Sequence, residues 1–378
     1  MPIDILTLDN DWAGLTPVRG NRPANWEAQE AVALALFENH KGLSHRVWKY
    51  RMEEVMTTDS FPLLFADSLN RELLNAFQSI GTPLAPLFHK KTLTDFKTAK
   101  MFRTEGMTKV LQKVLEKGEY LPREQGEEKV DIAVEKYGAQ VDFSWEAYLG
   151  DDLGAFQRFP NELAQSAINT EARAQTAIYI GATGPIAATF VDAVDGLAAL
   201  LALPLTIGNL ETALETMGEY TSSGEPIVSS PTYLVVPPAL EITARNILTS
   251  TYKQWTDGAG AVVDHETANT VAQRGLQLIV DPWIPILATT GTVGQTCWFL
   301  ATKPTDIPSA AFAKLAGNEA PALFMKSSDT TRVGGGLVSP FEGDFATDNI
   351  FYKVRHCLGA VALEPRGLIG SWGQADPT

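Results

Sequence analysis

Ser250 and Lys253 have the S-x-x-K spacing with which some acyl-transfer enzymes place a nucleophilic serine beside a lysine. Enzymes of that kind also carry S-D-N and K-T-G motifs, and this sequence contains neither motif. Chance therefore accounts for the spacing. A serine hydrolase that uses Ser250 and Lys253 remains an alternative function.

Histidine and cysteine spacing does not suggest a metal site. No histidines are four residues apart, and neither an HExxH nor a CxxC motif occurs. His356 lies on the apolar side of a predicted strand, where a hydrogen-bonded core histidine is expected. Cys297 and Cys357 are too few and too far apart for a disulfide framework, so buried, reduced thiols are expected. The histidines are His40, His45, His89, His265 and His356.

Two glycine-rich segments, residues 258–260 and 334–336, could in principle bind phosphate. Both lack a strand leading into a helix and a GK[ST] ending, so they are expected to be loops. The acid pairs at 127–128 and 151–152 are adjacent in sequence, and solvated side chains are the usual case for such pairs. The sequence thus predicts no catalytic, cofactor-binding or metal-binding residue and no cofactor, which argues against an enzyme.

Composition indicates a water-soluble globular protein. The 378 residues are 45% hydrophobic and 20% charged, and the formal net charge is -15. This charge repels phosphate backbones and anionic lipid, so general nucleic-acid binding is disfavoured. The longest apolar stretch, residues 196–207, is too short to span a bilayer, and the acidic N-terminus does not resemble a signal peptide. Folding in the cytoplasm, without membrane contact, is expected.

Hydrophobic periodicity predicts helices and strands without regular βαβ order, which is typical of the α+β class. The long helix expected at 160–180 has Pro160 in its first turn and Gly181 as its stop. At 1.5 Å per residue it would be roughly 31 Å long, a candidate structural spine. The other expected helices cover 61–80, 210–217 behind an Asn209 N-cap, and 237–249. The expected strands cover 96–102, 232–236, 276–280, 296–301, 323–325 and 350–361.

Residues 107–139 differ in character from the rest, because they are rich in charge and poor in large apolar side chains. Apolar and polar residues alternate here, and the apolar residues change from even to odd positions near Glu135 and Lys136. This pattern predicts a long two-stranded excursion with a bulge at this point. An isolated hairpin is marginally stable, so this one is expected to become ordered against a neighbouring molecule. Residues 1–60 contain helical spacing without a core of their own and are expected to form an N-terminal arm.

Several segments, in their order along the chain, resemble the tailed-phage major capsid proteins of the Hong Kong 97 fold. The resemblance covers roughly residues 55–372, and no single motif decides it. Its segments are KVLQKVLEKGEYL at 109–121, YGAQVDFSWEAYLGDD at 137–152 with 153–160 and the long helix behind it, PTYLVVPPAL at 231–240, CWFL at 297–300 and YKVRHCLG at 352–359.

This resemblance implies a structural subunit that assembles with itself, as pentamers and hexamers, into an icosahedral shell around double-stranded DNA. It implies a virion protein, assembled in the host cytoplasm, with portal, scaffold and possibly cement proteins as partners and no sequence-specific DNA binding. An encapsulin-like nanocompartment with the same fold is the other alternative. The implied domains are an N-terminal arm at 1–60, a peripheral domain at 61–106, 140–204 and 311–378, an extended loop at 107–139, and an axial domain at 205–310.

Overall fold

The computed structural model describes residues 61–105, 113–114, 116, 126–144, 153–192, 197–222, 224–256, 262–331, 333 and 343–374. The N-terminal arm predicted at 1–60 lies outside them. The chain divides into two compact units. The small unit comprises Met1–Arg71, Val141–Leu153 and Phe324–Tyr352, and the large unit comprises Glu72–Gln140, Gly154–Leu323 and Lys353–Thr378. This division differs from the predicted domains, which stay a prediction.

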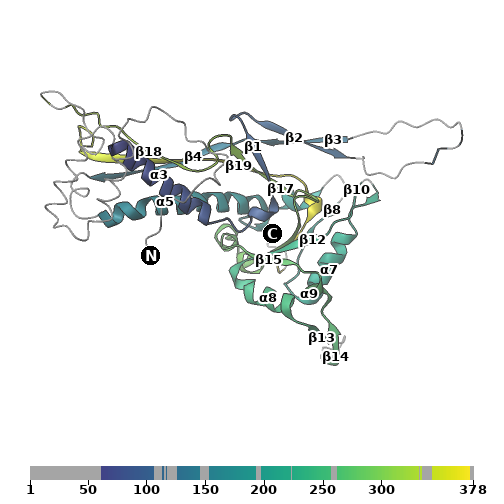
Figure 1. Ribbon diagram of the computed structural model, residues 1–378. Helices are drawn as coiled ribbons and strands as arrows, with labels where there is room; N and C mark the ends of the chain where they lie inside the picture. The colour runs from purple at the N-terminus through teal and green to yellow at the C-terminus, as the bar shows by residue number, and fades with distance from the viewer. Residues whose placement is uncertain are drawn as a thin grey trace, which may run out of the picture. The chain divides into compact units, whose positions relative to one another are not determined.

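The core of the large unit is built on a five-stranded sheet. Its central strands β12 and β16 are apolar along almost their whole length and buried, as a strand covered on both faces requires. β12 pairs parallel with β15 and antiparallel with β16, and Figure 1 shows α7, α8 and α9 beside these strands. In spatial order the strands are β15 (Gln277–Val280), β12 (Pro231–Val236), β16 (Trp298–Thr302), β20 (Leu368–Ser371) and β9 (Leu200–Leu201).

A second sheet contains the longest strand, β19 (Asn349–Ala362). Its residues alternate as predicted, with Ile350, Tyr352 and Val354 buried and Lys353 exposed. A Cβ atom at Gly359 would lie 2.0 Å from the carbonyl oxygen of Ala133, so the close approach of β19 to the Ala133 backbone requires glycine. β19 pairs with β17 (Ala310–Leu315), β18 (Ala322–Met325) and β4 (Glu135–Ser144), and β17 pairs parallel with β1 (Phe88–Leu93).

The predicted spine is the helix α5, which runs from Leu153 to Tyr179. Its 27 residues give a length of about 40 Å. The predicted start at Pro160 is wrong, because the helix begins seven residues earlier and Pro160 lies within it. Proline costs a helix one backbone hydrogen bond but does not always end it. At its C-terminal end Tyr179 is fully buried and stacks on Phe299 with ring centroids 5.2 Å apart.

The other predicted helices are present with shifted ends. α3 runs from Phe61 to Ser79, and α7 runs from Ile207 to Gly218. The predicted N-cap at Asn209 is wrong, because the Thr206 hydroxyl accepts the Asn209 N–H at 3.2 Å. After β12, the short helix η4 (Pro238–Leu240) leads into α8 (Glu241–Thr249), as predicted from the two prolines. None of the described helices is long and apolar enough to cross a membrane.

The predicted two-stranded excursion is partly corrected. β2 (Ala99–Glu105) pairs antiparallel with β3 (Gly126–Ile132) over seven residue pairs. The predicted bulge at Glu135–Lys136 is instead a break at Ala133 and Val134, after which β4 pairs with β19. Ile132 and Val134 are buried in a cluster that also contains Leu93, Ala311, Ala313, Leu315 and Cys357. Ile132 and Val134 therefore do not depend on a neighbouring molecule for their burial.

The remaining elements are short. They are η3 (Ala85–Leu87), β5 (Ile180–Gly181), β6 (Gly184–Pro185), α6 (Ala187–Phe190), β7 (Val191–Asp192), β8 (Leu197–Ala198), β10 (Thr221–Ser222), β11 (Glu225–Pro226), β13 (Tyr252–Thr256), β14 (Val262–Ala268), α9 (Thr270–Gln273), α10 (Ile284–Leu287), α11 (Val293–Thr296) and η6 (Pro365–Gly367). The predicted mixture of helices and strands is confirmed. Cys297 and Cys357 are free and buried, as predicted.

Candidate functional site

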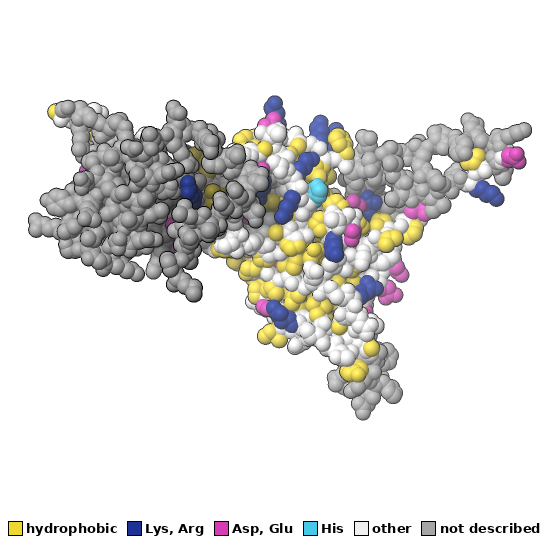
Figure 2. Space-filling view, in the orientation of Figure 1, with side chains coloured by type: hydrophobic (Ala, Val, Ile, Leu, Met, Phe, Trp, Pro, Cys, Tyr) yellow, Lys and Arg dark blue, Asp and Glu magenta, His cyan; other side chains and the backbone are white. Residues whose placement is uncertain are grey.

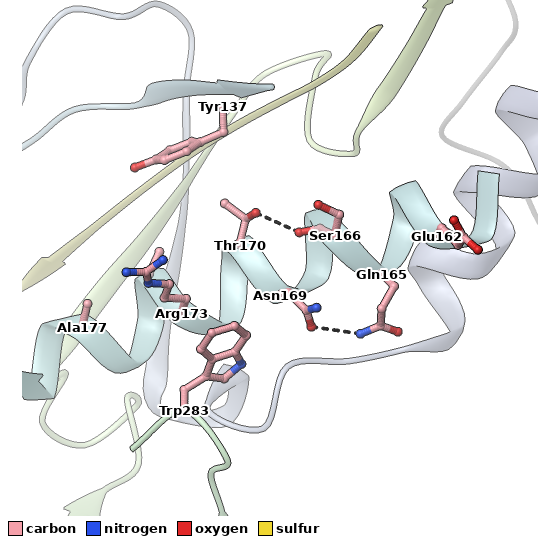
Figure 3. Close-up of a pocket in the computed structure, with 10 residues that line it drawn as sticks. Tyr137, Glu162, Gln165, Ser166, Asn169, Thr170, Arg173, Ala177 and Trp283 are labelled. Carbon is pink, nitrogen blue, oxygen red and sulfur yellow. Dashed lines mark hydrogen bonds between the residues drawn. The ribbon is translucent and has the colours of Figure 1, made fainter. Parts of the chain in front are cut away.

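The exposed face of α5 lines a groove of about 660 Å³ (Figure 3). Most of its lining side chains are amides, hydroxyls or small residues. Figure 3 shows Tyr137 of β4 and Trp283, which precedes α10, on opposite sides of the helix. The groove is lined by Tyr137, Glu162, Gln165, Ser166, Asn169, Thr170, Arg173, Ala174, Ala177 and Trp283.

The helical period places these α5 side chains in one row, because residues three and four apart share a face. Two hydrogen bonds stabilise the row. Gln165 Nε2 donates to Asn169 Oδ1 at 3.0 Å, and Thr170 Oγ1 donates to the Ser166 carbonyl at 2.8 Å. The opposite face of α5 carries the buried residues Leu163 and Ile168. The groove thus lies along the polar stripe of an amphipathic helix.

Each aromatic wall of the groove is held by a carboxylate. The Tyr137 hydroxyl donates to Glu135 at 3.0 Å, and burial together with this acid raises the pKa of Tyr137. The backbone N–H of Trp283 donates to Asp281 Oδ1 at 2.9 Å, and Asp281 Oδ2 accepts from Thr176 Oγ1 at 2.6 Å. Burial raises the pKa of Asp281, although its two hydrogen bonds oppose the shift. Asp281 therefore links Trp283 to the spine helix.

The chemistry of the groove suits binding. Among its ten described lining residues there is no histidine or cysteine that could activate a nucleophile. Glu162 and Arg173 contribute one charge of each sign. The amides and hydroxyls can donate and accept hydrogen bonds from a polar backbone. This arrangement fits contact with another polypeptide better than it fits catalysis.

A buried ionic cluster lies on the inner side of α5. Glu171 Oε1 is 2.7 Å from Lys314 Nζ of β17 and 2.7 Å from His356 Nε2 of β19. Burial alone raises the pKa of Glu171, but the hydrogen bond from His356 and the charge and hydrogen bond of Lys314 outweigh it and lower the net pKa. Phe77 of α3 packs edge-on against the His356 ring, and Lys314 lies over the Phe77 ring. The Glu171 carboxylate thus connects α5, β17 and β19, and Phe77 adds α3 through its contacts with His356 and Lys314.

Ser250 has a structural role that does not fit the serine hydrolase alternative. Its Oγ accepts a hydrogen bond from Asn269 Nδ2 at 2.8 Å and lies 3.3 Å from the Ile247 carbonyl oxygen at the end of α8. Asn269 is almost fully buried and also caps α9 through the N–H groups of Val271 and Ala272. Lys253 lies in β13. The Ser250 hydroxyl therefore helps to cap the C-terminal end of α8.

Of the other residues considered from the sequence, those that the structure describes are not brought together. His356 is a hydrogen-bonded core histidine, as predicted. Among the described residues no group of histidine, cysteine and acidic side chains has metal-binding geometry. The glycine-rich segments at 258–260 and 334–336 and the acids at 151–152 lie outside the described residues, and of the pair at 127–128 only the strand backbone is described.

Sequence reasoning missed Glu171 and Lys314. A signal was present, because Glu171 lies on the apolar stripe that Leu163, Ala167 and Ile178 define. His356 likewise lies on the apolar side of its strand. A charged or polar residue on a buried face needs a partner, so the sequence could have predicted that Glu171 and His356 pair with each other. The Tyr137 and Trp283 walls carried no such signal, because sequence does not show which strands and turns flank a helix.

Comparisons with known proteins show what the chain is similar to. A family model described as "Phage capsid protein" matches residues 127–371, well over half of the chain. No curated protein matches. The structure of a protein of Microbacterium phage Oxtober96 gives a TM-score of 0.46 at 11% identity, covering 79% of this chain and 89% of that chain. The capsid structure of the cyanophage P-SCSP1u gives a TM-score of 0.46 at 12% identity, covering 77% of this chain and 88% of that chain. An encapsulin complex from Synechococcus elongatus gives a TM-score of 0.45 at 12% identity, covering 78% of this chain and 88% of that chain.

Proposed function

Because this chain belongs to the phage capsid protein family, we propose that it is the major capsid protein of a tailed phage. In this proposal it assembles as pentamers and hexamers into an icosahedral shell that encloses double-stranded DNA. The family match over residues 127–371 is the observation that carries the proposal. The polar groove along α5 and the structural use of Ser250 support a role in binding rather than in catalysis.

The fold and domains proposed for this subunit are those of the Hong Kong 97 type. Residues 61–106, 140–204 and 311–378 form a peripheral domain around α5, and residues 205–310 form an axial domain. The arm at 1–60 and the extended loop at 107–139 reach other subunits. The partners are further copies of the chain, a portal, a scaffold and possibly cement proteins. The shell forms in the host cytoplasm and holds DNA without sequence-specific contacts.

Electron microscopy of the purified protein, alone and with a scaffold from the same phage, tests the function. Closed shells of uniform size are expected. A monodisperse monomer or dimer under every scaffold and salt condition would contradict the proposal. An encapsulin-like nanocompartment would also form shells, but these would collect a cargo protein. Shells isolated from infected cells are expected to contain DNA.

Assembly is expected to depend on salt. Each subunit carries a formal charge of -15, so approaching subunits repel one another at long range. At physiological ionic strength the Debye length is ~8 Å, whereas at 0.01 M it is about 30 Å. Light scattering should therefore show slower assembly and a lower yield at the lower ionic strength. Equal yields at both would mean that local charge complementarity, not net charge, controls association.

A further inference from the structure

Exposed apolar side chains lie on three elements of the large unit, the consecutive helices η4 and α8 and the helix α10. Ile242 at the start of α8 is 74% exposed, and Ile286 of α10 is 58% exposed. Figure 2 shows hydrophobic side chains over the region that Figure 1 labels α8 and β15. We define the apolar patch as Pro238, Ala239, Ile242, Pro285 and Ile286, all of which are exposed.

The two halves of the apolar patch are joined through α11. Contacts connect η4 with α11 and α11 with α10. The approach is close, since a Cβ atom at Gly294 of α11 would lie 2.9 Å from the Pro285 Cα atom. Trp283 immediately precedes α10 and forms one wall of the polar groove. Trp283 therefore belongs to the groove and lies two residues before Pro285 of the patch.

Charge distinguishes these elements from the nearby sequence of α7. Glu241 and Arg245 are the only charged residues among the described elements η4, α8, α10 and α11. They pair with each other at 2.8 Å, so these elements carry no net charge. By contrast, α7 carries three acids and no base, at Glu211, Glu215 and Glu219, the last at its C-terminal cap. Two copies that each carry -15 can approach with least repulsion where the surface is neutral.

We propose that the apolar patch, with Trp283 at its edge, is a contact between copies of this chain in the assembled shell. The proposal rests on the proposed capsid function and adds to it which surface meets a second copy. Burial of exposed isoleucines next to a tryptophan is typical of the centre of a protein interface. A nucleic acid would need unpaired basic side chains, which these elements lack. Contiguous exposed apolar side chains are also uncommon on proteins that remain monomeric.

The test compares Ile242→Asp and Ile286→Asp with Val228→Asp as a matched control. Val228 lies outside the patch and is 94% exposed, so the control makes the same change in charge and hydrophobicity. Asp at position 242 lies in the first turn of α8, where a helix tolerates an acid well. Circular dichroism should show folded subunits for all three. Sedimentation should show at least a tenfold loss of shells for each patch variant and less than a twofold loss for the control.

A second measurement does not depend on loss of assembly. Because Cys297 and Cys357 are buried, the thiol of Ile286→Cys can be followed by alkylation. It should react at least tenfold more slowly in shells than in free subunits. Equal rates, or protection only while a scaffold is present, would overturn the proposal. So would shells of normal yield from both patch variants, or an equal loss with Val228→Asp. If the wild-type chain itself forms no shells, the proposed function fails and this proposal fails with it.

Discussion

Replacement of residues 107–125 by a short Gly/Ser linker is expected to leave a folded subunit that no longer closes into shells. The replacement keeps β2 and β3, which pair over seven residues, and keeps Ile132 and Val134 in their buried cluster. Shortening the connection between two paired strands lowers the entropy cost of closing it. The subunit should therefore lose little or no stability of its own.

Assembly should fail because the replaced residues form the N-terminal part of the loop, 107–139, that is proposed to lie across a neighbouring subunit. Specific interfaces bury about 1,600 Å² in total, so removing an extended arm eliminates a large share of one contact. At 1.4 kcal/mol per tenfold change, a loss of about 4 kcal/mol at each contact weakens pairwise association roughly a thousandfold. Repetition of that loss at every subunit of a closed shell should abolish shell formation.

Sedimentation and electron microscopy measure the loss of shells, and thermal unfolding followed by circular dichroism checks that the subunit is folded. A linker of the same length as residues 107–125 is the matched control, because it keeps the reach but removes the side chains. Both linkers should prevent assembly. Normal shells with either linker would show that the loop contributes no essential contact, whereas unfolding would show that these residues belong to the subunit core.

Sequence periodicity predicted the strands and helices whose buried faces are apolar. TYLVV at 232–236 and the alternation at 350–361 are clear cases, because burial requires apolar side chains there. The strands β1 and β17 were missed. β1 contains the charged or polar run His89, Lys90 and Lys91, and β17 is rich in alanine, so neither has strong strand character. Their pairing with each other depends on residues more than 200 positions apart, which local patterns do not reveal.

The limits of the excursion illustrate the same difficulty. The change in alternation after Val134 was visible in the sequence, but a bulge and a change of pairing partner produce the same signal. Only the tertiary structure shows that β3 pairs with β2 whereas β4 pairs with β19. The groove was not predicted, because its walls, Tyr137 and Trp283, come from segments far from α5 in sequence. No catalytic residues were expected from the sequence, so no motif pointed to the position of the groove.

Glu171→Gln is expected to lower the free energy of unfolding of the unassembled subunit by about 3 kcal/mol at pH 7, at the low end of the range for broken buried ion pairs. The amide leaves Lys314 without its counter-ion and removes the strong acceptor of the His356 hydrogen bond. The Lys314 side chain keeps 27% exposure, so water can replace part of the lost interaction, which is why the low end applies.

Asp281→Asn is the matched control, because it makes the same carboxylate-to-amide change at the other buried acid beside α5. Burial raises the pKa of Asp281, so its ionised form costs stability at neutral pH. The amide oxygen can still accept from the Trp283 backbone N–H, and the amide nitrogen can donate to Thr176 Oγ1, whose hydroxyl then donates to the Ala172 carbonyl. This variant should be as stable as the wild type at pH 7, or more stable.

The two variants should also respond differently to acid. The pKa of Glu171 is lowered in the folded state, so its contribution is complete above the ordinary glutamate range of roughly 4–5 and is lost as the pH falls through that range and below it. The difference between wild type and Glu171→Gln should therefore shrink from pH 7 to pH 3. Urea unfolding at several pH values measures this difference in the free energy of unfolding.

A constant difference at all pH values would show that Glu171 acts through packing or hydrogen bonding alone. Equal stability of Glu171→Gln and Asp281→Asn at pH 7 would show that the ion pair with Lys314 does not stabilise the spine helix on its sheet.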